Sequence, residues 1–453
     1  MTPTTLRTES SGIALIALTL ALFAGAVRAQ EPPATQPKSA RYTVTDLGTL
    51  TDGQFSVAVG LNNKDLINGA SGLADFTQHA VVWKRGLLTD IAVPGLGGAN
   101  SEAFGVNAEG QAAGLAETTT SDPNGEDFCG FGTYVICLPF VWQHGVMTPL
   151  PTLGGNNAEG GQINDKGQVA GNAENTKLDL TCPPGGPQML EEKPVIWEQG
   201  RIKRLDTFRG DPDGWAFGIN DHDQAVGASG FCSTLNDDTG VYILSRHALL
   251  WDKGAVTDLG NLGGTGAFGP GNVAGEINNR GDVVGSSDLK GDTKFHAFLW
   301  TRKTGMKDLG TLHGDVNSAG LGVNDAGDAV GASFDEDGNP RAFLRKNGAM
   351  TDLNTLIPAD SPLYLLLAHG INSRGEIVGF GVDGAGDVHA FRATPCAGDA
   401  AAASWDRDAT TGAVGEVGAA TESPRGVPSE KARKFLQRQL RFSRFGVGLM
   451  GPR

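Results

Sequence analysis

The feature that most limits the fold of this chain is a repeated unit built around an asparagine. This asparagine recurs seven times, 45 to 58 residues apart, at Asn62, Asn107, Asn164, Asn220, Asn278, Asn324 and Asn372. Repetition at a period of this size is the sequence signature of solenoids, propellers and related arrays. The fold is therefore expected to follow from the structure of one unit and from the number of its copies.

Each copy contains four short apolar segments separated by Gly, Asn and Asp. In the fifth copy the second segment is GDVVG (281–285), the third is HAFLW (296–300) and the fourth is MKDLGTL (306–312). Short runs rich in Val, Leu, Phe and Trp between turn residues are typical of strands, and Asn and Gly supply the positive φ angles of tight hairpins. Four antiparallel strands per repeat is the pattern of a propeller blade. The sequence therefore predicts an all-β fold, a seven-bladed β-propeller of four-stranded antiparallel blades.

The ring is expected to close through the two ends of the repeat region. The last copy stops after its third segment, HAFRA at 389–393, whereas an additional fourth segment, YTVTDLGTL, stands at 42–50 before the first copy. An N-terminal strand paired with the last blade would remove the exposed strand edges of an open ring. We therefore predict that the N-terminal strand joins the last blade and closes the propeller.

Two positions of the repeat vary together. The third segment begins with His79, Pro139, Pro194, His247, His296, Arg341 and His389. The matching residues of the fourth segment are Asp90, Pro149, Arg204, Asp258, Asp308, Asp352 and, through the predicted closure, Asp46. Asp is present wherever the partner is His or Arg and missing where it is Pro, which suggests contact. We predict cross-strand His–Asp and Arg–Asp pairs. The alternative, a ring of catalytic or metal-binding histidines, would spread one residue per blade around the disc.

The first segment is the expected inner strand. Its pattern Ala-x-Gly-Ile/Val-Asn places small residues where neighbouring blades converge near the axis. Gln162 and Glu276 replace the Gly in two copies, and they either line a site or make ordinary polar contacts. The third segment ends in Trp in five copies, and we expect these residues to pack between blades: Trp83, Trp142, Trp197, Trp251 and Trp300.

The repeat region, residues 41–394, is flanked by segments of different composition. Residues 1–29 have the features of a signal peptide, with Arg7, an apolar run at 12–26 and small-residue cleavage after Ala29. The apolar run is short for a membrane span, so we expect a secreted or periplasmic protein with no transmembrane segment in the mature chain. The other flanks are a Pro-rich linker (30–40), a flexible linker (395–430) and a basic C-terminal tail (431–453). The tail could give weak contact with the cell envelope.

Three recurring motifs carry a resemblance to a known family. They are HAFLW at 296–300, DLGNLGG at 258–264 and INDKGQVAG at 163–171. Together they resemble the HAF-family extracellular repeat of bacterial proteins, and the resemblance extends over residues 42–393. It implies an exported, β-propeller-like repeat protein. The family has no established catalytic residues, so the resemblance transfers none to this chain.

The connections between the second and third segments are long in blades two, three and four, at residues 115–138, 172–193 and 228–246. In a propeller these connections share one face with the crossovers between blades. Binding residues concentrate on variable loops carried by a rigid scaffold; the alternative is that the insertions merely cover the disc. The candidate binding residues are Asp127, Phe128, Tyr134, Phe231, Asp237, Asp238, Tyr242 and, on the crossover between blades three and four, Trp215.

Four of the five cysteines lie in these same three connections. An exported chain permits disulfides, which would stiffen the insertions. We predict Cys129–Cys137 within one connection and Cys182–Cys232 between adjacent blades, although four cysteines allow three connectivities. A zinc site is the weaker alternative because no CxxC spacing occurs. Cys396 has no predicted partner.

The net charge of −15 argues against binding nucleic acid. The sequence has no P-loop, nucleophile elbow, HExxH or dinucleotide fingerprint, and we expect no cofactor. The leading hypothesis is an exported, non-catalytic propeller that binds a surface glycan or protein through the inserted loops. One alternative is a polysaccharide-acting hydrolase or lyase, which would need acidic or His side chains at the central channel. Another is a structural component of the envelope, anchored by the tail.

Overall fold

The computed structural model describes residues 41–51, 53, 55–75, 77–182, 188–233 and 242–396. These ranges include almost all of the repeat region. The predicted signal peptide, the Pro-rich linker and the C-terminal tail lie outside the described residues and remain predictions. Within the described ranges, no helix has the length and hydropathy that a membrane span needs.

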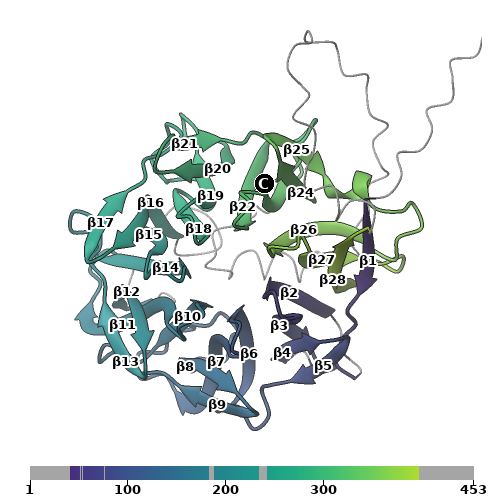
Figure 1. The fold of residues 1–453 in the computed structure, drawn as a ribbon. Helices are drawn as coiled ribbons and strands as arrows, with labels where there is room; N and C mark the ends of the chain where they lie inside the picture. The colour runs from purple at the N-terminus through teal and green to yellow at the C-terminus, as the bar shows by residue number, and fades with distance from the viewer. Residues whose placement is uncertain are drawn as a thin grey trace, which may run out of the picture. The chain divides into compact units, whose positions relative to one another are not determined.

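The described residues form a seven-bladed β-propeller, as predicted (Figure 1). Each blade is a four-stranded antiparallel sheet, and the strands run in order from the axis outward. Blades one to three are β2 (Phe55–Leu61), β3 (Leu66–Gly72), β4 (Gln78–Lys84), β5 (Leu87–Asp90); β6 (Gly97–Val106), β7 (Ala112–Ser121), β8 (Val135–Gln143), β9 (Val146–Pro149); and β10 (Ala158–Ile163), β11 (Val169–Leu178), β12 (Leu190–Glu198), β13 (Arg201–Arg204).

Blades four to six follow the same order. They are β14 (Asp213–Ile219), β15 (Ala225–Ser233), β16 (Tyr242–Asp252), β17 (Ala255–Asp258); β18 (Val273–Ile277), β19 (Val283–Asp288), β20 (Phe295–Thr301), β21 (Gly305–Asp308); and β22 (Asn317–Val323), β23 (Ala329–Phe334), β24 (Pro340–Lys346), β25 (Ala349–Asp352). Blade seven contains β26 (Tyr364–Ile371), β27 (Ile377–Val382), β28 (Val388–Pro395) and β1 (Tyr42–Asp46). A short 3-10 helix, η1 (Leu353–Leu356), precedes blade seven.

The N-terminal strand closes the ring as predicted. β1 pairs antiparallel with β28, in a register that runs from Tyr42 opposite Pro395 to Asp46 opposite Phe391. Figure 1 shows β1 beside β28 at the outer edge of the last blade. The blade is therefore built from both ends of the repeat region, and neither β28 nor β1 is left as the edge of an open ring.

The repeated asparagines form a closed ring of hydrogen bonds around the axis. Each Asn side chain donates through Nδ2 to the backbone carbonyl of the corresponding Asn in the next blade. The seven Nδ2–O distances lie between 2.7 and 3.3 Å, and the last bond runs from Asn372 back to Asn62. Sequence analysis identified these residues as turn formers, but it did not predict that they join the blades.

Each Asn also organises its own turn. In blade four, Asn220 Oδ1 accepts hydrogen bonds from the backbone N–H groups of His222 (3.0 Å) and Gln224 (3.1 Å). This is the Asx-turn geometry that makes Asn favourable at turns. One side chain therefore fixes the hairpin between the first two strands with its oxygen and the neighbouring blade with its nitrogen.

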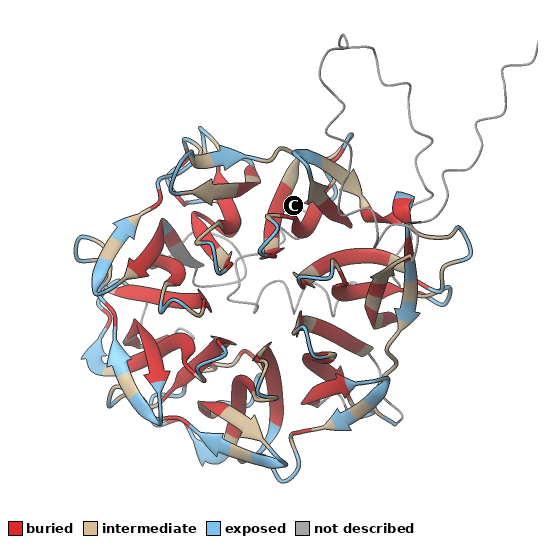
Figure 2. Ribbon diagram, in the orientation of Figure 1, coloured by how far each residue is buried: buried red, intermediate tan, exposed pale blue. Residues whose placement is uncertain are grey.

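Small residues allow the inner strands to approach one another. A Cβ added at Gly322 would lie 2.6 Å from His369 O in the next blade, and one added at Gly105 would lie 2.8 Å from Gln162 Cα. Both distances are too short for a side chain. Inner strands are accordingly mostly buried and outer strands mostly exposed (Figure 2). Apolar clusters lie between adjacent blades, for example with Ile196 of blade three against Leu249 of blade four.

The tryptophans join blades in the way their fixed position predicted. Trp83, Trp197 and Trp251 are buried. Their indole N–H groups donate to backbone carbonyls where the preceding blade ends, at Leu47 (2.9 Å), Pro151 (2.8 Å) and Asp206 (2.8 Å) respectively. The indole N–H thus fixes the position of a large apolar ring between two blades.

All five predicted His–Asp and Arg–Asp pairs are present. His79, His247, His296 and His389 place Nδ1 at 2.8, 3.1, 2.9 and 2.7 Å from Asp90, Asp258, Asp308 and Asp46, and Arg341 Nη1 lies 3.2 Å from Asp352. The partners are diagonal across the ladder rather than directly opposite, since Asp90 faces Val81. Each Asp also accepts the N–H two residues later, as Asp46 does from Gly48 at 2.8 Å. The pairs therefore fix the strand exit as well as the ladder.

The predicted closure can be tested by a cross-link, because Cys396 N donates to Arg41 O at 2.8 Å, just beyond the β1–β28 ladder. We expect Arg41→Cys to form an intramolecular disulfide with Cys396. Loop-closure entropy would then stabilise the oxidised protein by up to roughly 5 kcal/mol, measured as the difference in denaturant unfolding with and without reductant. Arg201→Cys, on exposed β13, is the control and should stay a free thiol. If the Arg41 variant titrates as many free thiols as the Arg201 variant, the closure is wrong.

The asparagine ring can be tested separately from the turns it organises. Asn220→Asp keeps the oxygen that accepts from His222 and Gln224 but replaces the Nδ2 donor to Asn278 O. We expect a loss of about 1–3 kcal/mol in the free energy of unfolding, because a buried carbonyl loses its donor. Asn261→Asp, at an exposed turn where Oδ1 accepts from Gly263 N, is the matched control. Equal urea midpoints for the two variants would contradict a stabilising role for the ring.

Candidate functional site

Two regions of the propeller have the residues from which a site could be built. The first is the set of insertions between the second and third strands of blades two, three and four, residues 115–138, 172–193 and 228–246, which we call the loop platform. The connections between the strands within these insertions are residues 122–134, 179–189 and 234–241. The second is a cavity among the inner strands. Residues 183–187 and 234–241 of the platform lie outside the described residues.

The platform connections are shorter than predicted, because much of the inserted sequence is strand. Glu117 pairs with Cys137, Glu174 with Glu192 and Ser233 with Tyr242. The insertions therefore extend the two middle strands beyond the face of the disc instead of forming long open loops. Polar residues such as Thr and Glu in these extensions obscured the strand pattern in the sequence.

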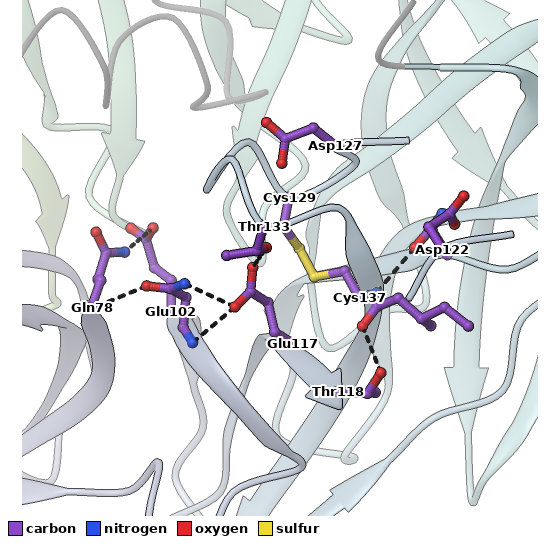
Figure 3. Close-up of a disulfide and its surroundings, with 12 residues drawn as sticks. Gln78, Glu102, Glu117, Thr118, Asp122, Asp127, Cys129, Thr133 and Cys137 are labelled. Carbon is purple, nitrogen blue, oxygen red and sulfur yellow. Dashed lines mark hydrogen bonds between the residues drawn. A yellow bond between two sulfur atoms is a disulfide. The ribbon is translucent and has the colours of Figure 1, made fainter. Parts of the chain in front are cut away.

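The blade-two connection is closed by the predicted disulfide Cys129–Cys137. Figure 3 shows Glu117 beside this bond, where it accepts hydrogen bonds from Thr133 Oγ1 and, at 2.8 Å, from Asn100 Nδ2. Phe128 is buried against Phe104, Leu115 and Cys137. This connection therefore has a small core of its own.

Hydrogen bonds join the connections of blades two and three. Asn157, at the start of blade three, donates to Asp122 Oδ2 (2.8 Å) and accepts from Cys137 N (3.0 Å). Met189 N donates to Glu126 Oε1. The blade-two connection is thus attached to its neighbour at both ends.

A disulfide and further hydrogen bonds join blades three and four. The predicted Cys182–Cys232 bond is present, and Cys232 N donates to Thr181 Oγ1 at 3.1 Å. Asp213, at the start of blade four, accepts from Glu192 N at 2.9 Å. The described parts of the platform are therefore linked into one continuous structure across three blades.

The structure brings some of the predicted binding residues to the surface and buries others. Tyr134 is exposed, and Asp127 is partly exposed, with Oδ1 accepting from Gly132 N at 2.9 Å. Phe231 is half-buried under the guanidinium of Arg246, at 5.3 Å from the ring centroid. Asp237 and Asp238 lie outside the described residues, and the Tyr242 side chain is not described, so these three stay predictions.

Two predicted binding residues are corrected by their burial. Phe128 is 3% exposed and Trp215 is 2% exposed. Trp215 packs against Phe217, Ala228 and Val273 and donates to Glu192 Oε2 at 2.8 Å. The prediction that these two aromatic residues contact a ligand is therefore wrong: Phe128 forms the core of its insertion, and Trp215 packs within the inner strands of blades four and five.

Two exposed apolar residues of the platform were not predicted from the sequence. Leu180 is 92% exposed and Leu178 is 60% exposed, both at the end of the blade-three extension. They belong to the segment KLDLT (177–181), whose alternation of polar and apolar residues could have indicated a strand with one solvent-facing apolar edge.

The buried carboxyl groups of the platform were not predicted from the sequence either. Glu126, Glu174, Glu192 and Asp213 are fully buried, and Asp122 and Asp179 nearly so. The Ala-Glu pair at 116–117 and again at 173–174, where blades one and four have Ser-Gly, was the available signal. Burial, followed by the charges of Glu126 and Glu192, raises the pKa of Glu174 to about 9. Glu174 is therefore protonated at neutral pH.

The second region is a cavity of about 30 Å³ among the inner strands of five blades. Its polar lining is Gln162, Glu276, Ser286 and His369. Burial raises the pKa of Glu276 to about 8 and lowers that of His369 to about 4, so neither side chain is charged at neutral pH. The volume holds about two water molecules, whereas small-molecule sites measure about 300 Å³ or more.

The two polar replacements in the inner strands follow a rule. In the other five blades, the side chain that precedes the inner-strand Gly is Val59, Phe104, Phe217, Leu321 or His369. In blades three and five the order is reversed, as Gly161-Gln162 and Gly275-Glu276, and the register is irregular at this point in every blade. Each inner strand therefore contributes one larger side chain, and Gln162 and Glu276 line the cavity, one of the two possibilities that the sequence left open.

Comparison with known proteins adds little. No family model and no curated protein matches the chain. Among solved structures, one similar chain is an arginine-to-alanine triple mutant of AofleA from Arthrobotrys oligospora, with 11% identity over 68% of this chain and 88% of that chain, at a TM-score of 0.31. A likeness at this score supports no inference about ligand or activity.

The raised pKa of Glu276 predicts that the free energy of unfolding depends on pH. The folded state keeps Glu276 protonated up to about pH 8, whereas the unfolded state releases this proton near the ordinary pKa of 4.5. The wild-type protein therefore loses stability, relative to a variant without the carboxyl, as pH rises from 4.5 to 8. We expect Glu276→Gln to leave the free energy of unfolding nearly unchanged at pH 4 and to raise it by up to about 4 kcal/mol at pH 8, the energy that corresponds to the shift in the pKa.

Blade three supplies the matched control, since Gln162 occupies the equivalent position. Gln162→Glu should show the reverse behaviour, with a loss at pH 8 and none at pH 4. Urea unfolding of the three proteins across this pH range measures both effects. A difference between wild type and Glu276→Gln that does not change with pH would contradict the burial of this carboxyl in the folded state.

Proposed function

We propose that this chain is an exported, non-catalytic β-propeller that binds a surface partner through the loop platform of blades two to four. The observation that carries the proposal is the way in which the platform is built. Two disulfides and hydrogen bonds across two blade boundaries fix the described parts of insertions that the propeller ring does not need. Rigid loops on one face lose little conformational entropy when a partner binds.

The exposed side chains of the platform favour a protein as the partner. Tyr134, Leu178 and Leu180 are 54%, 60% and 92% exposed, on the connections of adjacent blades that Glu126 and Met189 join. Aromatic residues are enriched at protein interfaces, where they act as anchors. Leucine offers a glycan no hydrogen bond, so a glycan partner would depend mainly on Tyr134 and Asp127.

The cavity among the inner strands supports the non-catalytic part of the proposal. Glu276 and His369 are the kind of acid and base that a propeller hydrolase or lyase would need near the axis. Their cavity, at about 30 Å³, admits water but not a sugar ring. Both residues are also neutral at pH 7, which suits a buried polar contact.

Export is supported by the two disulfides, because disulfides persist in oxidising compartments and are rare in the cytosol. Cys129–Cys137 and Cys182–Cys232 account for every cysteine of the three insertions. Secretion and periplasmic location are both compatible with this chemistry. The proposed signal peptide would supply the route.

Binding arrays test the proposal directly. Protein starting at Gln30 is applied to arrays of glycans and of surface-protein peptides, and hits are measured by surface plasmon resonance. We expect the triple variant Tyr134→Ala, Leu178→Ser, Leu180→Ser to lose at least about tenfold in affinity, since exposed anchors contribute on the order of 1 kcal/mol or more each. The control is Leu87→Ser with Val146→Ser, which are exposed at 68% and 62% on the outer strands β5 and β9.

Three results would separate the alternatives. Binding that survives the triple variant would remove the platform from the proposal. Binding that requires residues 397–453 instead would favour a structural envelope component anchored by its tail. Turnover of a polysaccharide, abolished by Glu276→Gln, would establish the hydrolase or lyase.

A further inference from the structure

The boundary between blades three and four brings two buried carboxylates next to a disulfide. Asp179 ends the blade-three extension and Asp213 begins blade four; they are 5% and 0% exposed. Ligand atoms of Asp179, Asp213, Cys182 and Cys232 all lie within 4.8 Å of one another. The platform therefore contains a compact group of oxygen and sulfur atoms that nothing in the propeller ring requires.

One oxygen of Asp179 lacks a hydrogen-bond donor. Its Oδ1 accepts from the N–H and the hydroxyl of Thr181, both at 2.7 Å. Its Oδ2 lies 3.2 Å from Cys182 Sγ. Because Cys182 is bonded to Cys232, this sulfur has no hydrogen to donate. The donor left for this second oxygen is the carboxyl group of Asp213, which can donate only when it is protonated.

Asp213 and its neighbour Gln188 show the same deficit. Asp213 Oδ1 accepts from Glu192 N (2.9 Å) and Gln188 Nε2 (3.0 Å). Asp213 Oδ2 and Gln188 Oε1 are buried and have no hydrogen-bond partner, although Gln188 is only 1% exposed. A buried acceptor without a donor costs about 1–3 kcal/mol, and more when it is charged. While neither carboxyl group carries a proton, three oxygen atoms from three side chains therefore lack a donor at one boundary.

The neighbouring buried carboxyl groups bring no cation to this boundary. Asp122, Glu126 and Glu174 are buried in the same platform. Among the described residues none of them, nor Asp179 or Asp213, forms an ion pair with Lys or Arg. Buried carboxylates are stable only when they are protonated, paired with a cation or bound to a metal.

We propose that Asp179, Asp213 and Gln188 bind a divalent cation, calcium, at the boundary between blades three and four. Two carboxylates and one amide oxygen form a neutral complex with a doubly charged ion. The donors are hard oxygen atoms, because the two sulfur atoms are already bonded to each other, and such donors select Ca²⁺ or Mg²⁺ rather than zinc. Calcium tolerates irregular geometry and completes its shell with water, whereas magnesium demands a near-ideal octahedron.

The bound ion would link blade three to blade four beside the Cys182–Cys232 disulfide. This link would form whether or not a partner is bound to the platform. Its affinity is expected in the range of extracellular calcium modules, with half-saturation at about 0.1–1 mM. Calcium binding would then raise the melting temperature of the oxidised protein in a saturable way. Magnesium at the same concentration should have a smaller effect.

Equilibrium dialysis and thermal unfolding test the proposal on the oxidised full-length protein in chelator-treated buffer at pH 7.5. We expect one bound calcium per chain at 2 mM CaCl₂, taken as about twice the upper end of that range, and an upward shift in melting temperature. Asp213→Asn should lose both, because it removes one charge and retains the size of the side chain. Asp179→Asn is the second variant, in case the first does not fold. Asp288→Asn is the matched control: Asp288 is also buried, with Oδ1 unpartnered, but it has no Gln188 equivalent.

The outcomes decide between a cation and a proton. Loss of the bound calcium and of the thermal shift in the Asp213 or Asp179 variant, with both retained in the Asp288 variant, supports the site. No saturable calcium binding to the wild-type protein, or binding unchanged by both site variants, overturns it. The two carboxyl groups would then share a proton instead.

Discussion

The structure depends on the hydrogen bond that each repeat asparagine makes to the next blade. Seven such bonds form a closed circle, and every bond uses a donor that is buried or half-buried beside the axis. The same side chain holds the hairpin of its own blade, so one residue fixes both the local turn, through its oxygen, and the contact between blades, through its nitrogen. The spacing of the repeat varies from 45 to 58 residues, whereas the asparagine is present in every copy. The insertions lie between the second and third strands, where they do not contact the asparagine ring.

The inserted connections are therefore added to a scaffold that is already complete. They are held by a different chemistry, with two disulfides, buried carboxylates and the small cores around Phe128 and Trp215. Aromatic rings and acids that would be ligand contacts on an exposed loop here face inward. Few exposed residues of the described platform are left for a partner, and they lie on a cross-linked support. Such a surface favours binding over catalysis.

The amount that could be predicted from the sequence differs between the ring and the platform. Periodicity located the seven blades, the closing strand and the five His–Asp or Arg–Asp pairs, because each copy is a control for the others. The two disulfide pairs were predicted from the positions of the cysteines in the insertions, although the sequence alone leaves three connectivities open. The burial of Phe128 could not be predicted, because its insertion occurs once and has no internal comparison. The burial of Trp215 could have been predicted, because it occupies the position of Val57, Val273 and Leu367 in the repeated inner strand, and these residues are buried as well. The asparagine ring was visible as a pattern, but a hydrogen bond to the next blade has no separate signature in one chain.

The strand that completes blade seven has a consequence for biosynthesis. β1 is synthesised before the other six blades, and its partner β28, at 388–395, is synthesised after them. Contacts over so long a sequence separation form slowly, so blade seven cannot be completed until the six other blades have been made. Until then the nascent protein has two unpaired sheet edges, at β1 and at the newest blade, and these are the surfaces that a chaperone would have to protect.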